Sequence, residues 1–161
     1  MLTQVDRPIV SKAAPKPPIG GLKLYGDGAS LADFSRLHAQ GMVTGFTTNP
    51  TLMFKAGIAD YADFARQLIA LIPDMPLSFE VFSDDFAEME RQARLIAAWG
   101  DNVYVKIPIT NTQGQSSLPM ARALAADGVK LNITAMLTLE QVAEAVDILA
   151  DDTPAILSVF A

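Results

Sequence analysis

The chain has 161 residues, of which 50% are hydrophobic and 19% are charged, and its net charge is −6. This length suits one domain with a sizeable core, and the acidic balance argues against nucleic acid or an anionic membrane as a partner. The sequence has no cysteine and a single histidine, His38, which excludes disulfides, thiolate catalysis and zinc sites built from cysteine and histidine.

The N-terminal segment is rich in Pro, Lys and Gly and lacks the apolar stretch of a signal peptide. We expect a flexible lead-in over residues 1–21, followed by one folded unit over 22–161. No run in the sequence approaches the roughly 18 apolar residues that a membrane-spanning helix needs. These features predict a cytoplasmic protein without a membrane partner.

Strand-like runs and helical patterns alternate through the folded unit. Short runs rich in Val, Ile, Leu, Phe and Tyr predict strands at 22–25, 43–47, 77–82, 103–107, 130–134 and 155–160. Amphipathic patterns predict helices at 31–41, 60–72, 84–100, 118–128 and 138–152. The last four helices begin at or near Asp, Ser or Thr, which are common N-cap residues. Strict alternation predicts an α/β fold with parallel strands and right-handed crossovers.

Two architectures fit this alternation, an open doubly wound sheet and a (β/α) TIM barrel. Length favours the open sheet, because an eight-stranded barrel usually has about 250 residues. Side-chain alternation favours the barrel, because five predicted strands carry apolar residues on one face and a polar group near the C-terminal end on the other. Barrels gather catalytic groups at the C-terminal ends of their strands. We therefore expect a TIM barrel of which about the first six strands are present.

A lysine, Lys106, interrupts the otherwise apolar run NVYVKIPIT on the fourth of these strands. A buried ammonium costs free energy unless it pairs or loses its charge, and a neutral amine is a nucleophile. Matching faces of neighbouring strands carry Glu80, Asp27, Asn132 and Thr134. A lysine among carboxylates, amides and hydroxyls suits Schiff-base formation with a carbonyl substrate, in which Glu80 and Asp27 move protons.

Five motifs in chain order resemble the strand motifs of the transaldolase family. They are GFTTNPTL (45–52), FEVF (79–82), VKIPIT (105–110), LNITAM (131–136) and LSVFA (157–161). The resemblance implies a barrel enzyme that moves a dihydroxyacetone unit from a ketose phosphate, such as sedoheptulose or fructose phosphate, to an aldose phosphate through a lysine Schiff base. It implies the pentose phosphate pathway, sugar phosphates as partners, and no metal or cofactor.

The resemblance also implies a role for each matching residue. Lys106 matches the Schiff-base lysine. Glu80 and Thr134 match a pair that holds a water for dehydration of the carbinolamine, and Asp27 matches the carboxylate that takes a proton from a substrate hydroxyl. The residues that match groups around the dihydroxyacetone unit are Asn49, Asn132 and Ser158, with Phe160 as an aromatic over the site.

Several alternatives stay open. The related small aldolases that cleave fructose phosphate usually carry Gln and Tyr at the positions of Glu80 and Phe160, which favours a transaldolase over an aldolase of that type. From the residues alone, Asn49 fits a helix cap equally well, Asp27 fits a turn, and Glu80 fits an ion-pair partner of Lys106.

The family motif that begins SVFA continues into a Gly-Arg, whose arginine binds the substrate phosphate, and two more strand–helix units follow it. This sequence ends at Ala161, so a non-catalytic barrel fragment is the remaining alternative. A barrel of six strands has unpaired edges, which also makes a homo-oligomer an expected state.

Overall fold

Six parallel strands form one sheet in the computed structural model, which describes residues 21–149 and 153–160. The strands are β1 (Tyr25–Asp27), β2 (Gly45–Thr47), β3 (Leu77–Glu80), β4 (Val103–Pro108), β5 (Leu131–Met136) and β6 (Ala155–Val159). Their order in the sheet is their order in the sequence, so each strand pairs with its sequence neighbours. The sheet curls into half a barrel, which confirms the partial TIM barrel and not the doubly wound sheet, whose strand order reverses.

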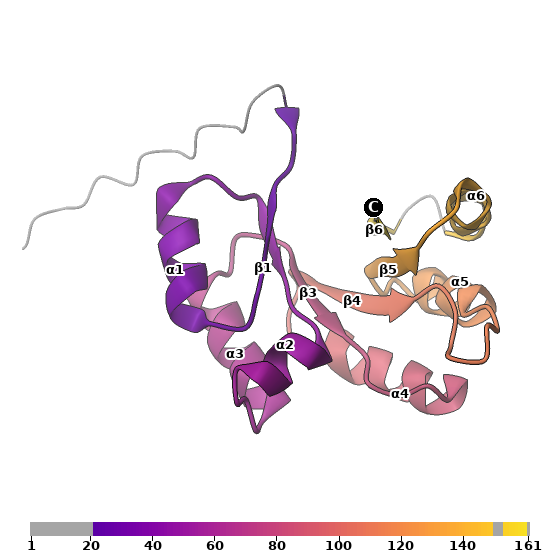
Figure 1. The fold of residues 1–161 in the computed structure, drawn as a ribbon, viewed down its shortest axis with the longest axis horizontal. Coiled ribbons are helices and arrows are strands. Elements are labelled where there is room, and N and C mark those ends of the chain that lie inside the picture. Colours follow the sequence, from indigo (N-terminus) through magenta and orange to yellow (C-terminus); the bar gives the residue numbers. More distant parts are fainter. Residues whose placement is uncertain (1–20, 150–152, 161) are drawn as a thin grey trace, which may run out of the picture.

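Six helices connect the strands and follow the outer side of the curled sheet (Figure 1). They are α1 (Leu31–Gln40), α2 (Pro50–Lys55), α3 (Tyr61–Leu71), α4 (Phe86–Ala97), α5 (Leu118–Ala126) and α6 (Leu139–Ile148). The side chains of Asp60, Asp85 and Thr138 cap α3, α4 and α6, as the sequence predicts. Ser117 precedes α5 but its hydroxyl donates to the carbonyls of Pro108 and Ile109 instead.

The start of the sheet differs from the sequence prediction. The sequence predicts a strand over 22–25, but β1 begins at Tyr25, and Leu22 and Leu24 of the predicted strand are 64% and 46% exposed. The register of β1 with β2 begins at Tyr25 opposite Gly45. Among the described residues before it, only the Leu24 carbonyl accepts bonds from the β2-side residue Thr44, which leaves the Leu22 and Leu24 side chains uncovered. The apolar run alone therefore placed the strand too early in the chain.

Within the described residues, the ends of other elements shift by up to three residues, and α2 was not among the helices predicted from amphipathic patterns. The predicted lead-in over 1–21 lies, apart from Gly21, outside the described residues, and so does the end of the helix predicted at 138–152. Within the described ranges, no helix has the length and apolar content needed to cross a membrane.

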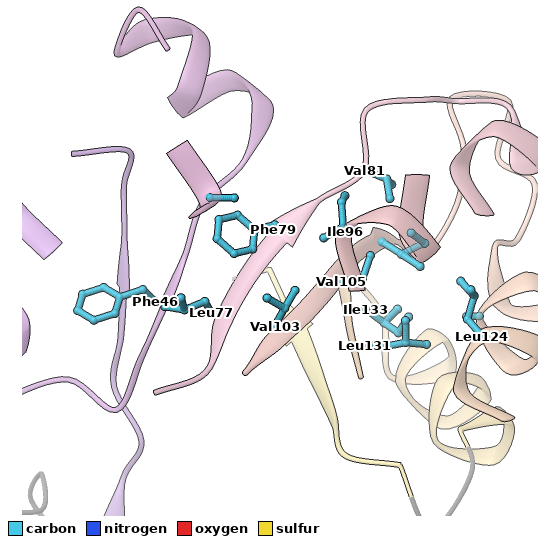
Figure 2. Close-up of a cluster of buried hydrophobic side chains, with 14 of the residues drawn as sticks. Phe46, Leu77, Phe79, Val81, Ile96, Val103, Val105, Leu124, Leu131 and Ile133 are labelled. Atoms are coloured by element: carbon cyan, nitrogen blue, oxygen red, sulfur yellow. The ribbon is translucent and has the colours of Figure 1, made fainter. Parts of the chain in front are cut away.

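The core lies between the sheet and the helices. Alternate residues of the strands are buried on this side, and Figure 2 shows them packed with Ile96 of α4 and Leu124 of α5. The strand residues in this cluster include Phe46, Leu77, Phe79, Val103, Val105, Leu131 and Ile133. Along β4 every second residue is buried and the residues between are only half-buried. The predicted two-sided pattern is therefore confirmed along β4 and leaves its other face free for polar groups, whereas Val159 of β6, predicted on the apolar face, is 53% exposed.

Candidate active site

A hollow of about 610 Å³ lies where the strands end. Six of the predicted site residues line it, namely Asp27, Asn49, Glu80, Lys106, Thr134 and Phe160. They come from β1, the start of α2, β3, β4, β5 and the residue after β6. The other two, Asn132 and Ser158, lie two residues earlier on the same strand faces as Thr134 and Phe160. The fold thus brings all eight to the concave side of the sheet.

Lys106 and Glu80 form the centre of this hollow. They are register partners on β4 and β3, and the Lys106 Nζ lies 3.2 Å from the Glu80 Oε2, with 11% and 17% of the two side chains exposed. Burial raises the pKa of Glu80, and the nearby Asp27 charge adds to this, although the Lys106 ammonium opposes it. Glu80 therefore holds a proton more readily than a free glutamate does. It can exchange that proton with the neighbouring Lys106 nitrogen.

The Thr134 hydroxyl is buried and has no hydrogen-bond partner within the described residues. A buried hydroxyl without a partner costs free energy, which marks the position as one where a water or ligand would be stabilised. A register shift in β5 between Ile133 and Met136 surrounds it, and Ala135 adopts a left-handed φ of 62°. The bulge buries Met136 in the core and turns Ala135 towards the hollow, so Thr134 lies at a locally strained point of the strand.

A chain of hydrogen bonds runs below the hollow. The Ser158 hydroxyl donates to the Asn132 Oδ1 at 2.7 Å, and the Asn132 Nδ2 donates to the Ser78 Oγ at 3.0 Å. Asn132 is also the register partner of Lys106. Both ends of its amide are thus held beside the lysine. The sequence analysis did not identify Ser78, although its position two residues before Glu80 places it on the same face.

Asp27 lies at the other side of the hollow, on the edge strand β1. The Thr47 hydroxyl donates to its Oδ1 at 2.5 Å across the β1–β2 pair. The flanking glycines make a turn a natural reading of the sequence, but Asp27 is the last residue of a strand. The sequence analysis did not identify Thr47, because the motif TTNP does not indicate which residue of the neighbouring strand lies opposite its hydroxyl.

Asn49 and Phe160 lie at the rim. The Asn49 Oδ1 accepts the Leu52 amide at 2.9 Å and caps α2, which is the alternative that the sequence left open. Phe160 is 54% exposed, and its amide donates to the Met136 carbonyl at 2.8 Å. The rim also contains Asp84, whose carboxylate accepts both the amide and the hydroxyl of Thr112, at 2.8 and 2.6 Å.

Six sequential parallel strands with a lysine and polar groups at their C-terminal ends define a (β/α)-barrel protein with its candidate site on the concave face. The sequence model described as Transaldolase/Fructose-6-phosphate aldolase matches residues 24–161. The chain belongs to this transaldolase and fructose-6-phosphate aldolase family.

Curated relatives carry names from the same family. The chain is 38% identical to a probable transaldolase of Dehalococcoides mccartyi over 120 residues, which cover 74% of this chain and 54% of that protein. A probable transaldolase of Hyphomonas neptunium is 37% identical, with 74% and 53% covered. The probable transaldolase 2 of Listeria monocytogenes is 34% identical, with 74% and 52% covered. The chain therefore spans about half the length of the curated relatives it matches.

Proposed function

We propose that this chain carries the Schiff-base chemistry of a transaldolase, which transfers a dihydroxyacetone unit from a ketose phosphate to an aldose phosphate. The family match supports this class of reaction. The single observation that carries the proposal is the Lys106–Glu80 pair at 3.2 Å in the hollow, where the pKa of Glu80 is raised by burial.

The first step is formation of an iminium on Lys106. The Lys106 ammonium must lose a proton before its nitrogen attacks the ketone carbonyl, and Glu80 is the carboxylate within reach. The carbinolamine then loses its hydroxyl as water, which requires a proton donor. Glu80 returns that proton through a water that the Thr134 hydroxyl also binds, so the buried hydroxyl gains a partner during the reaction.

The second step is cleavage of the carbon–carbon bond. Asp27 takes the proton from the substrate hydroxyl on the far side of that bond. The oxygen electrons form the carbonyl of the leaving aldose, and the electrons of the broken bond move into the iminium to give an enamine. The enamine then attacks the acceptor aldehyde, Asp27 returns the proton to the new hydroxyl, and water hydrolyses the iminium to release Lys106.

The dihydroxyacetone unit is bound by three polar side chains. Asn132, held by Ser158 and Ser78, and Ser158 itself lie next to the attacked carbon. Asn49 uses Oδ1 to cap α2, so its amide nitrogen is the atom that binds a substrate hydroxyl. Phe160 covers the site. This reaction needs no metal or cofactor, and we assign it to the pentose phosphate pathway in the cytoplasm.

Reductive trapping tests the proposal. Borohydride added with fructose phosphate should leave a covalent adduct on the peptide that contains Lys106, and Lys106→Met should abolish the adduct. Loss of an enzyme's nucleophile lowers turnover by about 10⁶-fold in a comparable case. Lys130→Met is the matched control, because the Lys130 Nζ is exposed and donates to the Asp101 carbonyl. An adduct on Lys130, or none with the parent chain, would contradict the proposal.

A separate experiment distinguishes the aldolase alternative. An aldolase releases dihydroxyacetone in the absence of an acceptor, whereas a transaldolase keeps the enamine until an aldose phosphate arrives. Product analysis with and without aldose phosphate therefore separates the two. Glu80 and Phe160, where the related aldolases usually have Gln and Tyr, favour the transaldolase. A chain that forms no adduct would support the non-catalytic barrel fragment.

A further inference from the structure

Asp27 is held less firmly by the sheet than the other charged groups of the hollow. Lys106 and Glu80 lie on β4 and β3, which have a neighbouring strand on each side. Asp27 is the last residue of β1, a strand of three residues that pairs with β2 alone within the described part of the chain, and its side chain is exposed. A general base in such a place needs a contact that fixes its carboxylate.

Thr47 makes that contact in two ways. Its carbonyl accepts the amide of Gly28 at 3.1 Å, which holds the backbone just after Asp27. Its hydroxyl donates to the Asp27 Oδ1 at 2.5 Å, within the range of a strong hydrogen bond to a carboxylate. The bond uses one carboxylate oxygen and fixes the rotation of the side chain, so the second oxygen is left to receive a proton.

We propose that Thr47 is a positioning residue for Asp27 in the cleavage step. The inference rests on the proposed function, in which Asp27 takes the proton of the substrate hydroxyl. A general base must lie within hydrogen-bond reach of that proton, and a displacement of about 1 Å can cost 10²-fold in rate. Iminium formation depends on Lys106, Glu80 and Thr134, none of which the Thr47 hydroxyl contacts. Thr47 therefore governs cleavage and leaves iminium formation unchanged.

Three variants of the full chain test this role. Thr47→Val keeps the shape of the side chain and removes the hydroxyl, and Thr47→Ser keeps the hydroxyl. Thr44→Val is the matched control. The Thr44 hydroxyl also donates a hydrogen bond across the β1–β2 pair, but it does so to the Leu24 carbonyl, at 3.1 Å and at the other end of the pair from Asp27. Each variant is mixed with fructose phosphate in a single turnover. The borohydride-trapped adduct and the released aldose phosphate are measured separately.

We expect Thr47→Val to form the Lys106 adduct as the parent does and to release aldose phosphate roughly 10- to 100-fold more slowly. Thr47→Ser should restore most of the cleavage rate, and Thr44→Val should cleave at the parental rate. Cleavage by Thr47→Val at the parental rate, or a slow Thr47→Ser, would overturn the positioning role alone. A parent chain that forms no adduct would overturn the proposed function and this role together.

A second measurement does not depend on activity. In urea unfolding, Thr47→Val should lower the unfolding midpoint of the parent chain, because it removes the hydrogen bond to Asp27. In an Asp27→Ala background this bond is already absent, so Thr47→Val should leave the midpoint unchanged. Equal shifts in the two backgrounds would show that the hydroxyl does not bond to Asp27 in solution, which would also overturn the inference.

Discussion

The two faces of the curled sheet carry different kinds of side chain although the same strands form both. On the helix-covered face of β4, Val103, Val105 and Ile107 are buried among apolar side chains. On the concave face, Lys106 lies between Tyr104 and Pro108 with 11% of its side chain exposed. Successive side chains point to opposite sides of a strand, so one six-residue strand serves the core and the candidate site at once.

The residues that stabilise the fold therefore lie on one face of the sheet, and the residues of the candidate site lie on the other. The helix-covered face gains its free energy from apolar burial, which depends on volume and not on particular atoms. The concave face depends on particular atoms at hydrogen-bond distance, such as the Lys106 Nζ and the Glu80 Oε2. A substitution on one face should therefore leave the property of the other face largely intact.

Apart from loss of the Lys106 nucleophile itself, the largest expected effect comes from the concave face. Glu80→Gln should lower the turnover number by about 10²- to 10⁴-fold, the usual contribution of a general acid or base, with a smaller change in KM. Steady-state kinetics with fructose phosphate and an aldose phosphate acceptor measure it. Asp84→Asn is the control at the rim of the same hollow and should cost less than about 10-fold. Full activity of Glu80→Gln would remove Glu80 from the proposed mechanism.

The helix-covered face should respond in stability. Leu131 is fully buried on β5, and Leu131→Ala should lower the free energy of unfolding by about 2 to 5 kcal/mol. Leu95 on α4 is 51% exposed, so Leu95→Ala should cost less than about 1 kcal/mol. Urea unfolding compares the two, and the folded fraction of each variant should still form the Lys106 adduct. Equal losses would show that the sheet does not bury Leu131 as the structure has it.

Gly45, on the concave side, sharpens the comparison, because its substitution should lower stability as a substitution in the core does. A Cβ added at Gly45 would overlap the Tyr25 ring and come within 2.9 Å of the Pro76 carbonyl oxygen. Gly45→Ala should therefore destabilise the chain by about 1 to 3 kcal/mol, because it forces the β1–β2 pair apart. Gly28→Ala, whose Cβ would lie 3.3 Å from the Phe34 ring, should cost less. Thermal unfolding of both variants checks this order.

The smallest expected effect is the pH dependence of stability. The pKa of Glu80 is raised, chiefly by burial, so the folded chain holds its proton more tightly than the unfolded chain. The stability from this group is present below pH 4.5 and is lost as the pH rises through the folded value. Relative to Glu80→Gln, the parent should therefore lose stability as the pH rises above 4.5.

Asp84 provides a control with the opposite sign. Hydrogen bonds from Thr112 lower the pKa of Asp84 below its ordinary 3.8, so its contribution is present above that pH and is lost as the pH falls. Relative to Asp84→Asn, the parent should lose stability on acidification. Urea unfolding between about pH 3 and pH 7 measures both differences. Parallel slopes in the two comparisons would contradict the assigned environments of these carboxylates.

The alternation of strands and helices along the chain and the polar face of the strands could be predicted from the sequence because both follow from local periodicity. Alternation in VYVKIP predicts which residues share a face with Lys106, and N-cap residues such as Asp60 and Thr138 predict helix starts. The roles of Glu80, Asp27 and Asn132 remain predictions from the family resemblance. Their proximity is a matter of strand register, which periodicity alone does not contain.

The sequence by itself determined the six-fold strand–helix alternation, the two-faced strands and the lysine at the end of the fourth. Only the tertiary structure decided where β1 begins, which hydroxyl holds Asp27, and that the Thr134 hydroxyl lacks a partner in the described residues. The physical reason is distance along the chain. Thr47 and Asp27 are 20 residues apart, and a hydrogen bond between them exists only after β1 and β2 have paired in register.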